Sequence, residues 1–141
     1  MSSHACQSIV FRCLDFRLKP SVLSSLLAEV GCPDGSYDLV SVAGAAKDFL
    51  SNNPAEVQFL KKQLWLSQQL HGVKEVIFLM HENCGAYGIA DKKVEMETFD
   101  ADLKKIISAL KQSAEFAGLH YKAFIIVGVE SGKLSLQPFS V

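Results

Sequence analysis

Two short segments of this sequence carry side chains that bind metals. Residues 13–17 read CLDFR and residues 81–85 read HENCG. Zinc takes thiolate and imidazole ligands in a tetrahedral set, and a catalytic site leaves one position for water. Cys13, His81 and Cys84 would supply two thiolates and one imidazole, with the fourth position open. Because His-x-x-Cys alone is a weak motif, the prediction of a zinc site depends on the two segments lying together.

Each segment directly follows an apolar run that predicts a buried strand. Residues 8–11 read SIVF and residues 74–80 read KEVIFLM, and each run leads straight into a metal-binding segment. Further strands of this kind are predicted at residues 38–43 and 122–129. Apolar residues at helical spacing, bounded by proline or glycine, predict helices at residues 20–30, 54–71 and 99–117.

The alternation of strands and helices is typical of a parallel sheet that is covered on both faces. A last strand at residues 133–136 follows the turn at residues 130–132, which suits an antiparallel hairpin. We therefore predict an α/β three-layer sandwich. Its central, mostly parallel sheet has four strands plus an antiparallel edge strand, with helices on both faces. Ligands of such sheets bind beyond the carboxyl ends of the strands, which is where both segments would lie.

Two stretches give weaker signals. Residues 47–53 fit either a short helix or a loop, and residues 86–97 are polar and irregular. We interpret the charged residues 91–97 as a solvated segment, with a mobile loop that gates access as the alternative. Glu82 and Asn83 are interpreted as turn residues within the second metal-binding segment.

The bulk properties narrow the class of protein. A chain of 141 residues predicts a single domain over residues 1–141. A formal net charge of -1 argues against nucleic acid as a partner, and no apolar run is long enough for a membrane span. Residues 1–7 lack the features of a signal peptide, so we expect a cytoplasmic protein. Its four cysteines are then better read as metal ligands or free thiols than as disulfides.

The two segments resemble the zinc motifs of the β-class carbonic anhydrases, Cys-x-Asp-x-Arg and His-x-x-Cys-Gly. Residues 41–46 (SVAGAA) resemble the Ala-Gly segment that follows the second strand in that family. Residues 128–136 (GVESGKLSL) resemble its late strand, turn and strand. The likeness covers roughly residues 8–136 in family order, and the family fold agrees with the sheet predicted above.

The resemblance implies a role for five residues. Cys13, His81 and Cys84 bind zinc. Asp15 lies next to the fourth coordination position, where it accepts a hydrogen bond from the hydroxide and directs it at carbon dioxide. Arg17 pairs with Asp15 and holds it ionised and oriented. In some family members the aspartate instead ligates zinc and closes the site, and the sequence leaves both states of Asp15 open.

The activity that the resemblance implies is that of a zinc lyase interconverting carbon dioxide and bicarbonate. Zinc lowers the pKa of bound water to about 7, so a zinc-bound hydroxide is available near neutrality. Ala43, Gly44 and Gly85 are candidates for the lining of the substrate pocket. The resemblance also implies a small-molecule substrate and a homodimer or higher homo-oligomer.

The sequence departs from the family pattern at several positions. Leu14 and Phe16 stand where the family has small residues, and Ala45 stands where it often has asparagine. Twelve residues precede Cys13, so we expect neither the N-terminal helical extension nor the glutamine it places near the substrate. These departures leave two alternatives: a zinc hydrolase of carbonyl sulfide or carbon disulfide, and a non-catalytic zinc-binding module.

The remaining cysteines and histidines receive simpler interpretations. Cys6 and Cys32 are read as free structural thiols, because no Cys-x-x-Cys motif exists. His4, His71 and His120 are better explained as surface or helix-end residues than as proton relays.

Overall fold

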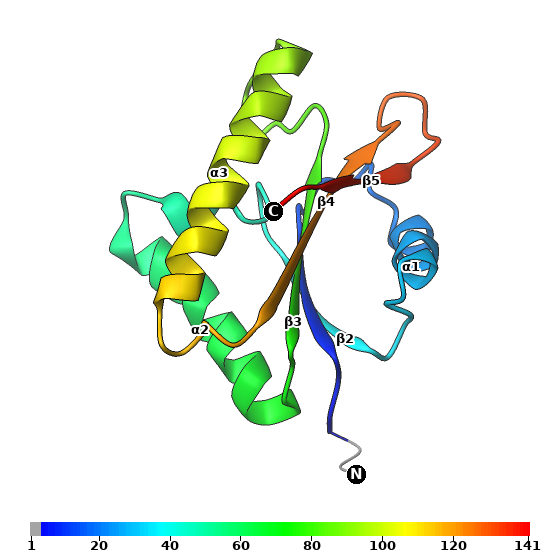
Figure 1. Ribbon diagram of the computed structural model, residues 1–141. Helices are drawn as coiled ribbons and strands as arrows, with labels where there is room; N and C mark the ends of the chain where they lie inside the picture. Colours follow the sequence, from blue (N-terminus) through cyan, green and yellow to red (C-terminus); the bar gives the residue numbers. More distant parts are fainter. Residues whose placement is uncertain (1–3) are drawn as a thin grey trace.

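The computed structural model describes residues 4–141, and its centre is a five-stranded sheet in the order β2-β1-β3-β4-β5 (Figure 1). The strands are β1 (Ser8–Arg12), β2 (Tyr37–Ser41), β3 (Glu75–His81), β4 (His120–Val127) and β5 (Ser135–Phe139). The first four strands run parallel to their neighbours, and β5 is antiparallel to β4. The predicted fold class, a mostly parallel sheet with an antiparallel edge strand, is confirmed.

The helices are α1 (Pro20–Glu29), α2 (Pro54–His71) and α3 (Lys92–Gln112), with a 3-10 turn η1 (Lys47–Leu50) before α2. Figure 1 shows α2 and α3 on one face of the sheet and α1 on the other. Asn53 caps α2 by accepting a hydrogen bond from the Ala55 N–H at 3.0 Å. Gly72 ends α2 with a φ of 65°, a left-handed conformation that glycine adopts without strain.

The core lies mainly between the central strands and the helices α2 and α3. Both β1 and β3 are buried along their whole length, as continuous apolar runs in a doubly covered sheet should be. The Phe11 ring packs against Phe49 and Phe78, with centroids 5.4 and 5.6 Å away. Burying one side chain of this size stabilises the fold by about 1.5–3 kcal/mol.

The last long helix begins and ends earlier than predicted. It starts at Lys92 instead of residue 99, because Asp91 caps it by accepting a hydrogen bond from the Val94 N–H at 3.0 Å. Residues 91–97 are mostly exposed, as expected of a solvated segment, but residues 92–97 are helical and Glu95 is buried, so the alternative of a mobile loop is wrong. The backbone becomes extended at Ser113, so the helix stops before the predicted end at residue 117.

The final strand is also displaced from its prediction. It spans Ser135–Phe139 instead of residues 133–136, and Ser135 is opposite Val127. The connection before it is longer than a tight hairpin. Gly128 opens it with a φ of 82°, and a Cβ there would come 2.0 Å from the Lys133 carbonyl oxygen. Pro138 is tolerated in β5 because an edge strand has one unpaired side.

The topology decides where the two metal-binding segments lie. Adjacent pairing of β1 and β3 places Arg12 opposite Leu79, so the chain leaves both strands at the same edge of the sheet. The amino ends of the parallel strands lie at the other edge. No helix among residues 4–141 is both long and apolar enough to cross a membrane.

Candidate metal centre

Cys13, His81 and Cys84 come together at the carboxyl edge of the sheet. Cys13 follows β1 directly, His81 is the last residue of β3, and Cys84 follows within the next turn. One ligand atom from each residue lies within 4.8 Å of the others. All three residues are buried, with exposed fractions of 4%, 1% and 4%. The structure thus brings together the three residues that the sequence predicted to lie close to one another.

His81 has one ring nitrogen bonded and the other free. Its Nδ1 lies 2.8 Å from the Glu82 carbonyl oxygen, which fixes Nδ1 as the hydrogen-bond donor when the ring is neutral. Its Nε2 is buried without any hydrogen-bond partner within the described chain. A buried polar atom normally has a partner. A lone pair on Nε2, facing two thiols, is the arrangement that a zinc ligand needs, so these residues fit the metal.

The two thiols differ in how readily each loses its proton. A hydrogen bond from Cys84 holds the pKa of Cys13 well below its ordinary value, and bonds from His81 and the Gly44 N–H act in the same direction. The same contact with Cys13, together with burial, raises the pKa of Cys84. Burial opposes the charged form of His81, but the neighbouring Cys13 thiolate and the Glu82 carbonyl outweigh burial and raise the pKa of His81. The cluster thus favours positive charge, and a metal cation could take the place of the protons on the cysteines and His81.

Asp15 and Arg17 form a two-pronged ion pair beside this cluster. Arg17 Nη2 donates to Asp15 Oδ2 at 2.7 Å, and Arg17 Nε donates to Oδ1 at 3.0 Å. The backbone N–H of Arg17 also donates to Oδ1, at 2.9 Å. These bonds lower the pKa of Asp15 to about 2. Asp15 Oδ2 lies 3.8 Å from His81 Nε2, so an ionised carboxylate faces the ligand cluster.

Arg17 also joins the two metal-binding segments. Its Nη2 donates to the Asn83 carbonyl oxygen at 2.9 Å, across a sequence separation of 66 residues. Asn83 has a φ of 56°, a left-handed conformation that asparagine tolerates better than most residues. This conformation turns the chain sharply between His81 and Cys84.

Glu95 is a functional candidate that the sequence prediction missed. Its exposed fraction is 2%, although it stands in the stretch predicted to be solvated. Oε1 accepts a hydrogen bond from the Asn83 N–H at 2.7 Å, and Oε2 accepts one from the Cys84 N–H at 3.0 Å. The signal was its position four residues before Phe99, on the buried stripe of α3. A carboxylate on an apolar stripe indicates a buried partner.

The side chain of Glu82 ties the same turn to the residues that follow β4 and to Lys92. Its Oε1 accepts hydrogen bonds from the backbone N–H groups of Gly128 and Val129 at 2.6 and 3.1 Å. Its Oε2 lies 3.3 Å from Lys92 Nζ. The carboxylates of Glu95 and Glu82 therefore both hold the segment that presents His81 and Cys84.

The three candidates for the substrate pocket lie at this edge but in different environments. Gly44 is buried, and its N–H donates to Cys13 Sγ at 3.4 Å. Its φ is 76°, and a Cβ there would come 2.9 Å from the Lys47 Cβ, so a larger residue would be strained. Ala43 and Gly85 are exposed.

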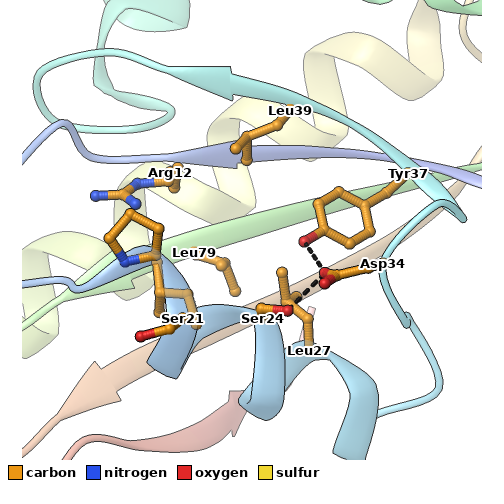
Figure 2. A pocket seen from close by; sticks show the side chains of 10 residues that line it. Arg12, Ser21, Ser24, Leu27, Asp34, Tyr37, Leu39 and Leu79 are labelled. Atoms are coloured by element: carbon orange, nitrogen blue, oxygen red, sulfur yellow. Dashed lines mark hydrogen bonds between the residues drawn. The ribbon is translucent and has the colours of Figure 1, made fainter.

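A separate cavity of about 470 Å³ lies on the α1 side of the sheet (Figure 2). Its lining includes Arg12 and Leu79 from the central strands, but none of the three ligand residues. Arg12 Nε donates to the Cys13 carbonyl oxygen at 2.6 Å, and its Nη2 donates to the Asp15 carbonyl oxygen at 3.2 Å. Arg12 thus connects the wall of this cavity to the backbone of the first metal-binding segment.

A family model described as "Putative carbonic anhydrase" matches residues 3–129. The chain belongs to this carbonic anhydrase family. An uncharacterised protein of Rickettsia conorii is 26% identical over 133 residues, which cover 94% of this chain and 65% of the relative. The chain thus spans just under two thirds of that relative's length.

Solved structures of carbonic anhydrases have the same fold. The enzyme of Streptococcus mutans matches with a TM-score of 0.62 at 17% identity, covering 96% of this chain and 84% of that one. One of two tetrameric β-carbonic anhydrases of Sordaria macrospora matches with a TM-score of 0.62 at 11% identity, covering 97% and 84%. At these identities the likeness establishes the fold. The resemblance stated from the sequence motifs is confirmed, and the chain is a divergent member of the carbonic anhydrase family.

Proposed function

We propose that this chain is a zinc enzyme that interconverts carbon dioxide and bicarbonate. The observation that carries the proposal is the free Nε2 of buried His81, which faces two buried cysteines and lies 3.8 Å from the Asp15 carboxylate. The ligand cluster and the ionised carboxylate of Asp15 both belong to the two motifs that resemble those of the β-class carbonic anhydrases. The family membership and the fold support the same activity.

In this proposal Cys13, His81 and Cys84 hold the zinc ion. Two thiolates and a neutral imidazole leave one position of a tetrahedral set for solvent or substrate. When bound, zinc supplies a nucleophilic hydroxide near neutral pH by lowering the pKa of water to about 7. The bond from Nδ1 to the Glu82 carbonyl sets the tautomer of His81, and the Gly44 N–H stabilises the Cys13 thiolate.

Asp15 is assigned to accept a hydrogen bond at the open position and orient the group that donates it. An acceptor must be ionised for this role, and its pairing with Arg17 keeps the pKa of Asp15 at about 2. Both Asp15 oxygens receive hydrogen bonds from Arg17. We therefore favour Asp15 as a hydrogen-bond acceptor over Asp15 as a fourth metal ligand.

The assembly is proposed to be a homodimer or a larger homo-oligomer of single-domain chains. Leu14 and Phe16, which flank Asp15, have exposed fractions of 60% and 90%. We assign these two exposed apolar side chains to a contact between subunits. The Sordaria macrospora neighbours are tetrameric, which supports the proposal.

We propose the cytoplasm as the compartment of this protein. The four cysteines are free thiols, which fits a reducing compartment.

The activity is tested by stopped-flow hydration of carbon dioxide with zinc-loaded protein. We expect hydration above the buffer rate, and we expect Asp15→Asn to lower it while zinc stays bound. The same preparations, given carbonyl sulfide or carbon disulfide, test the alternative substrates by sulfide release. Sulfide release without carbon dioxide hydration would reassign the substrate, and zinc binding without either activity would leave a non-catalytic module.

A further inference from the structure

A second cluster of metal-binding side chains lies at the amino edge of the sheet, away from the first. One ligand atom each from Cys6, Asp38 and His71 lies within 4.8 Å of the others. Cys6 precedes β1, Asp38 is near the start of β2, and His71 is the last residue of α2. All three are partly buried. Residues 4–7 form an N-terminal arm before β1. Figure 1 shows this arm near the C-terminal end of α2.

Backbone bonds hold this cluster in place. The Cys6 N–H donates to the His71 carbonyl oxygen at 3.1 Å, which fastens the arm to the end of the helix. The Gln7 carbonyl oxygen accepts hydrogen bonds from the N–H groups of Lys74 and Glu75 at 2.9 and 3.2 Å. Ser67 Oγ donates to Asp38 Oδ2 at 2.7 Å and orients the carboxylate. The donor atoms therefore belong to segments that are hydrogen-bonded to one another.

The donor types fit a borderline divalent cation such as zinc. Zinc accepts thiolate, imidazole and carboxylate ligands, and each is present once. His71 Nδ1 lies 2.6 Å from Asp38 Oδ2, so without a cation the pair is a hydrogen bond. An ionised Cys6 and Asp38 would together carry two negative charges, which one divalent cation neutralises. Burial disfavours the Cys6 thiolate when no cation is present, and the Asp38 carboxylate acts in the same direction, so the Cys6 pKa is raised.

His4 lies close enough to supply a fourth donor. Its ring centroid is 6.1 Å from that of His71, and it is exposed two positions before Cys6 in the same arm. To bind with the other three residues, His4 would turn one of its ring nitrogens toward the cluster. With His4 the set has two imidazoles, one thiolate and one carboxylate, which completes a closed tetrahedral site of the structural kind.

We propose that Cys6, Asp38 and His71, completed by His4, bind a second zinc ion that ties the N-terminal arm to β2 and to the end of α2. The role is structural, because four protein ligands leave no position for substrate. This site does not depend on the proposed function, since it shares no residue with the cluster at the opposite edge.

The test is the zinc content of the purified full-length chain, measured by inductively coupled plasma mass spectrometry after dialysis against zinc-free buffer. We expect Cys6→Ser to lose one zinc per chain relative to wild type, with any carbon dioxide hydration unchanged. His71→Ala is the second variant and should lose the same zinc. Cys32→Ser, which changes a buried cysteine outside both clusters, is the matched control and should lose none.

Cobalt(II) substitution adds a spectroscopic reading of the same site. Wild type should show more thiolate-to-cobalt absorption than Cys6→Ser, by the amount that one cysteine ligand contributes. Equal zinc contents in wild type, Cys6→Ser and His71→Ala would overturn the proposal. So would a loss that Cys32→Ser shares, because that result would reflect unfolding. If the chain binds this zinc but does not hydrate carbon dioxide, this proposal stands and the proposed function fails.

Discussion

Glu95 Oε2 accepts a hydrogen bond from the Cys84 backbone N–H at 3.0 Å, so a residue of α3 positions one cysteine of the metal cluster. The other oxygen of Glu95 accepts from the Asn83 N–H at 2.7 Å. The Glu95 side chain is buried, so bulk water does not compete for these bonds. The turn that carries His81 and Cys84 therefore depends on one carboxylate from a neighbouring helix.

Glu95→Ala is expected to weaken zinc binding although no ligand is removed. Two buried N–H groups lose their acceptor, which costs about 1–3 kcal/mol for each. Changes to the residues that orient metal ligands commonly lower metal affinity by about 10–100-fold. Competition with a chromophoric chelator measures the affinity. Glu97→Gln, on the exposed side of the same helix, is the control and should bind zinc as wild type does. Unchanged affinity in Glu95→Ala would contradict this role.

Arg17→Lys is expected to lower carbon dioxide hydration while zinc content stays constant. Lysine keeps the positive charge but cannot hold both Asp15 oxygens and the Asn83 carbonyl in one planar fork. A loss of about 10–100-fold in kcat/KM is expected for a residue that positions another. Asp15→Asn should lose more, since it removes the acceptor itself. Wild-type rates in Arg17→Lys would show that the ion pair is dispensable.

Ionisation of Tyr121 is expected to make the stability of the fold depend on pH, whether or not a metal is bound. Burial raises its pKa to about 12, and its hydroxyl donates to the Phe116 carbonyl oxygen at 2.9 Å. Unfolded tyrosine ionises near pH 10, so above that value the unfolded state has lost a proton that the folded state keeps. Stability from this group is fully present below about pH 10 and is lost as the pH rises toward 12.

Urea unfolding of wild type and Tyr121→Phe across this alkaline range measures that loss. The free energy of unfolding of wild type should fall more steeply than that of Tyr121→Phe, by an amount on the order of 1–2 kcal/mol. The phenylalanine variant should start slightly less stable, because the Phe116 carbonyl loses its donor. Parallel curves for the two proteins would contradict the raised pKa.

Phe16→Ser is expected to weaken self-association. Phe16 has an exposed fraction of 90% and stands beside Asp15, on the apolar surface that we assign to a subunit contact. Size-exclusion chromatography with light scattering should show wild type as a dimer or larger and the variant shifted toward monomer. Val94→Ser, a similar change of an exposed apolar residue on α3, serves as control. A monomeric wild type would contradict the proposed assembly.

Much of the fold was predictable because its central strands are continuous apolar runs. Residues 8–11 and 74–80 read as buried strands, and a parallel sheet brings their carboxyl ends together. Cys13 and His81 could therefore be placed side by side without knowledge of the register. The Arg17–Asp15 pair followed from the resemblance to the family motif, and the structure shows it as two direct hydrogen bonds between the side chains.

Other parts depended on contacts that the sequence does not encode locally. Glu95 stands in the charge-rich stretch 91–97, so the sequence indicated neither the early start of α3 nor the buried carboxylate that holds Cys84. The displacement of β5 depends on the loop that opens at Gly128. The cluster of Cys6, Asp38 and His71 draws on an arm, a strand and a helix end. Cys6 and His71 were interpreted singly, as a free thiol and as a surface or helix-end histidine, because the arm, β2 and the end of α2 meet only in the folded chain.

The central claim is that zinc at Cys13, His81 and Cys84 supports carbon dioxide hydration. The most direct measurement is stopped-flow hydration by the wild-type chain before chelation, after removal of zinc, and after its return. We predict that hydration is lost with the metal and restored in proportion to the zinc rebound at this cluster. Hydration no faster than buffer, in protein whose Cys13, His81 and Cys84 demonstrably hold zinc, would contradict the account.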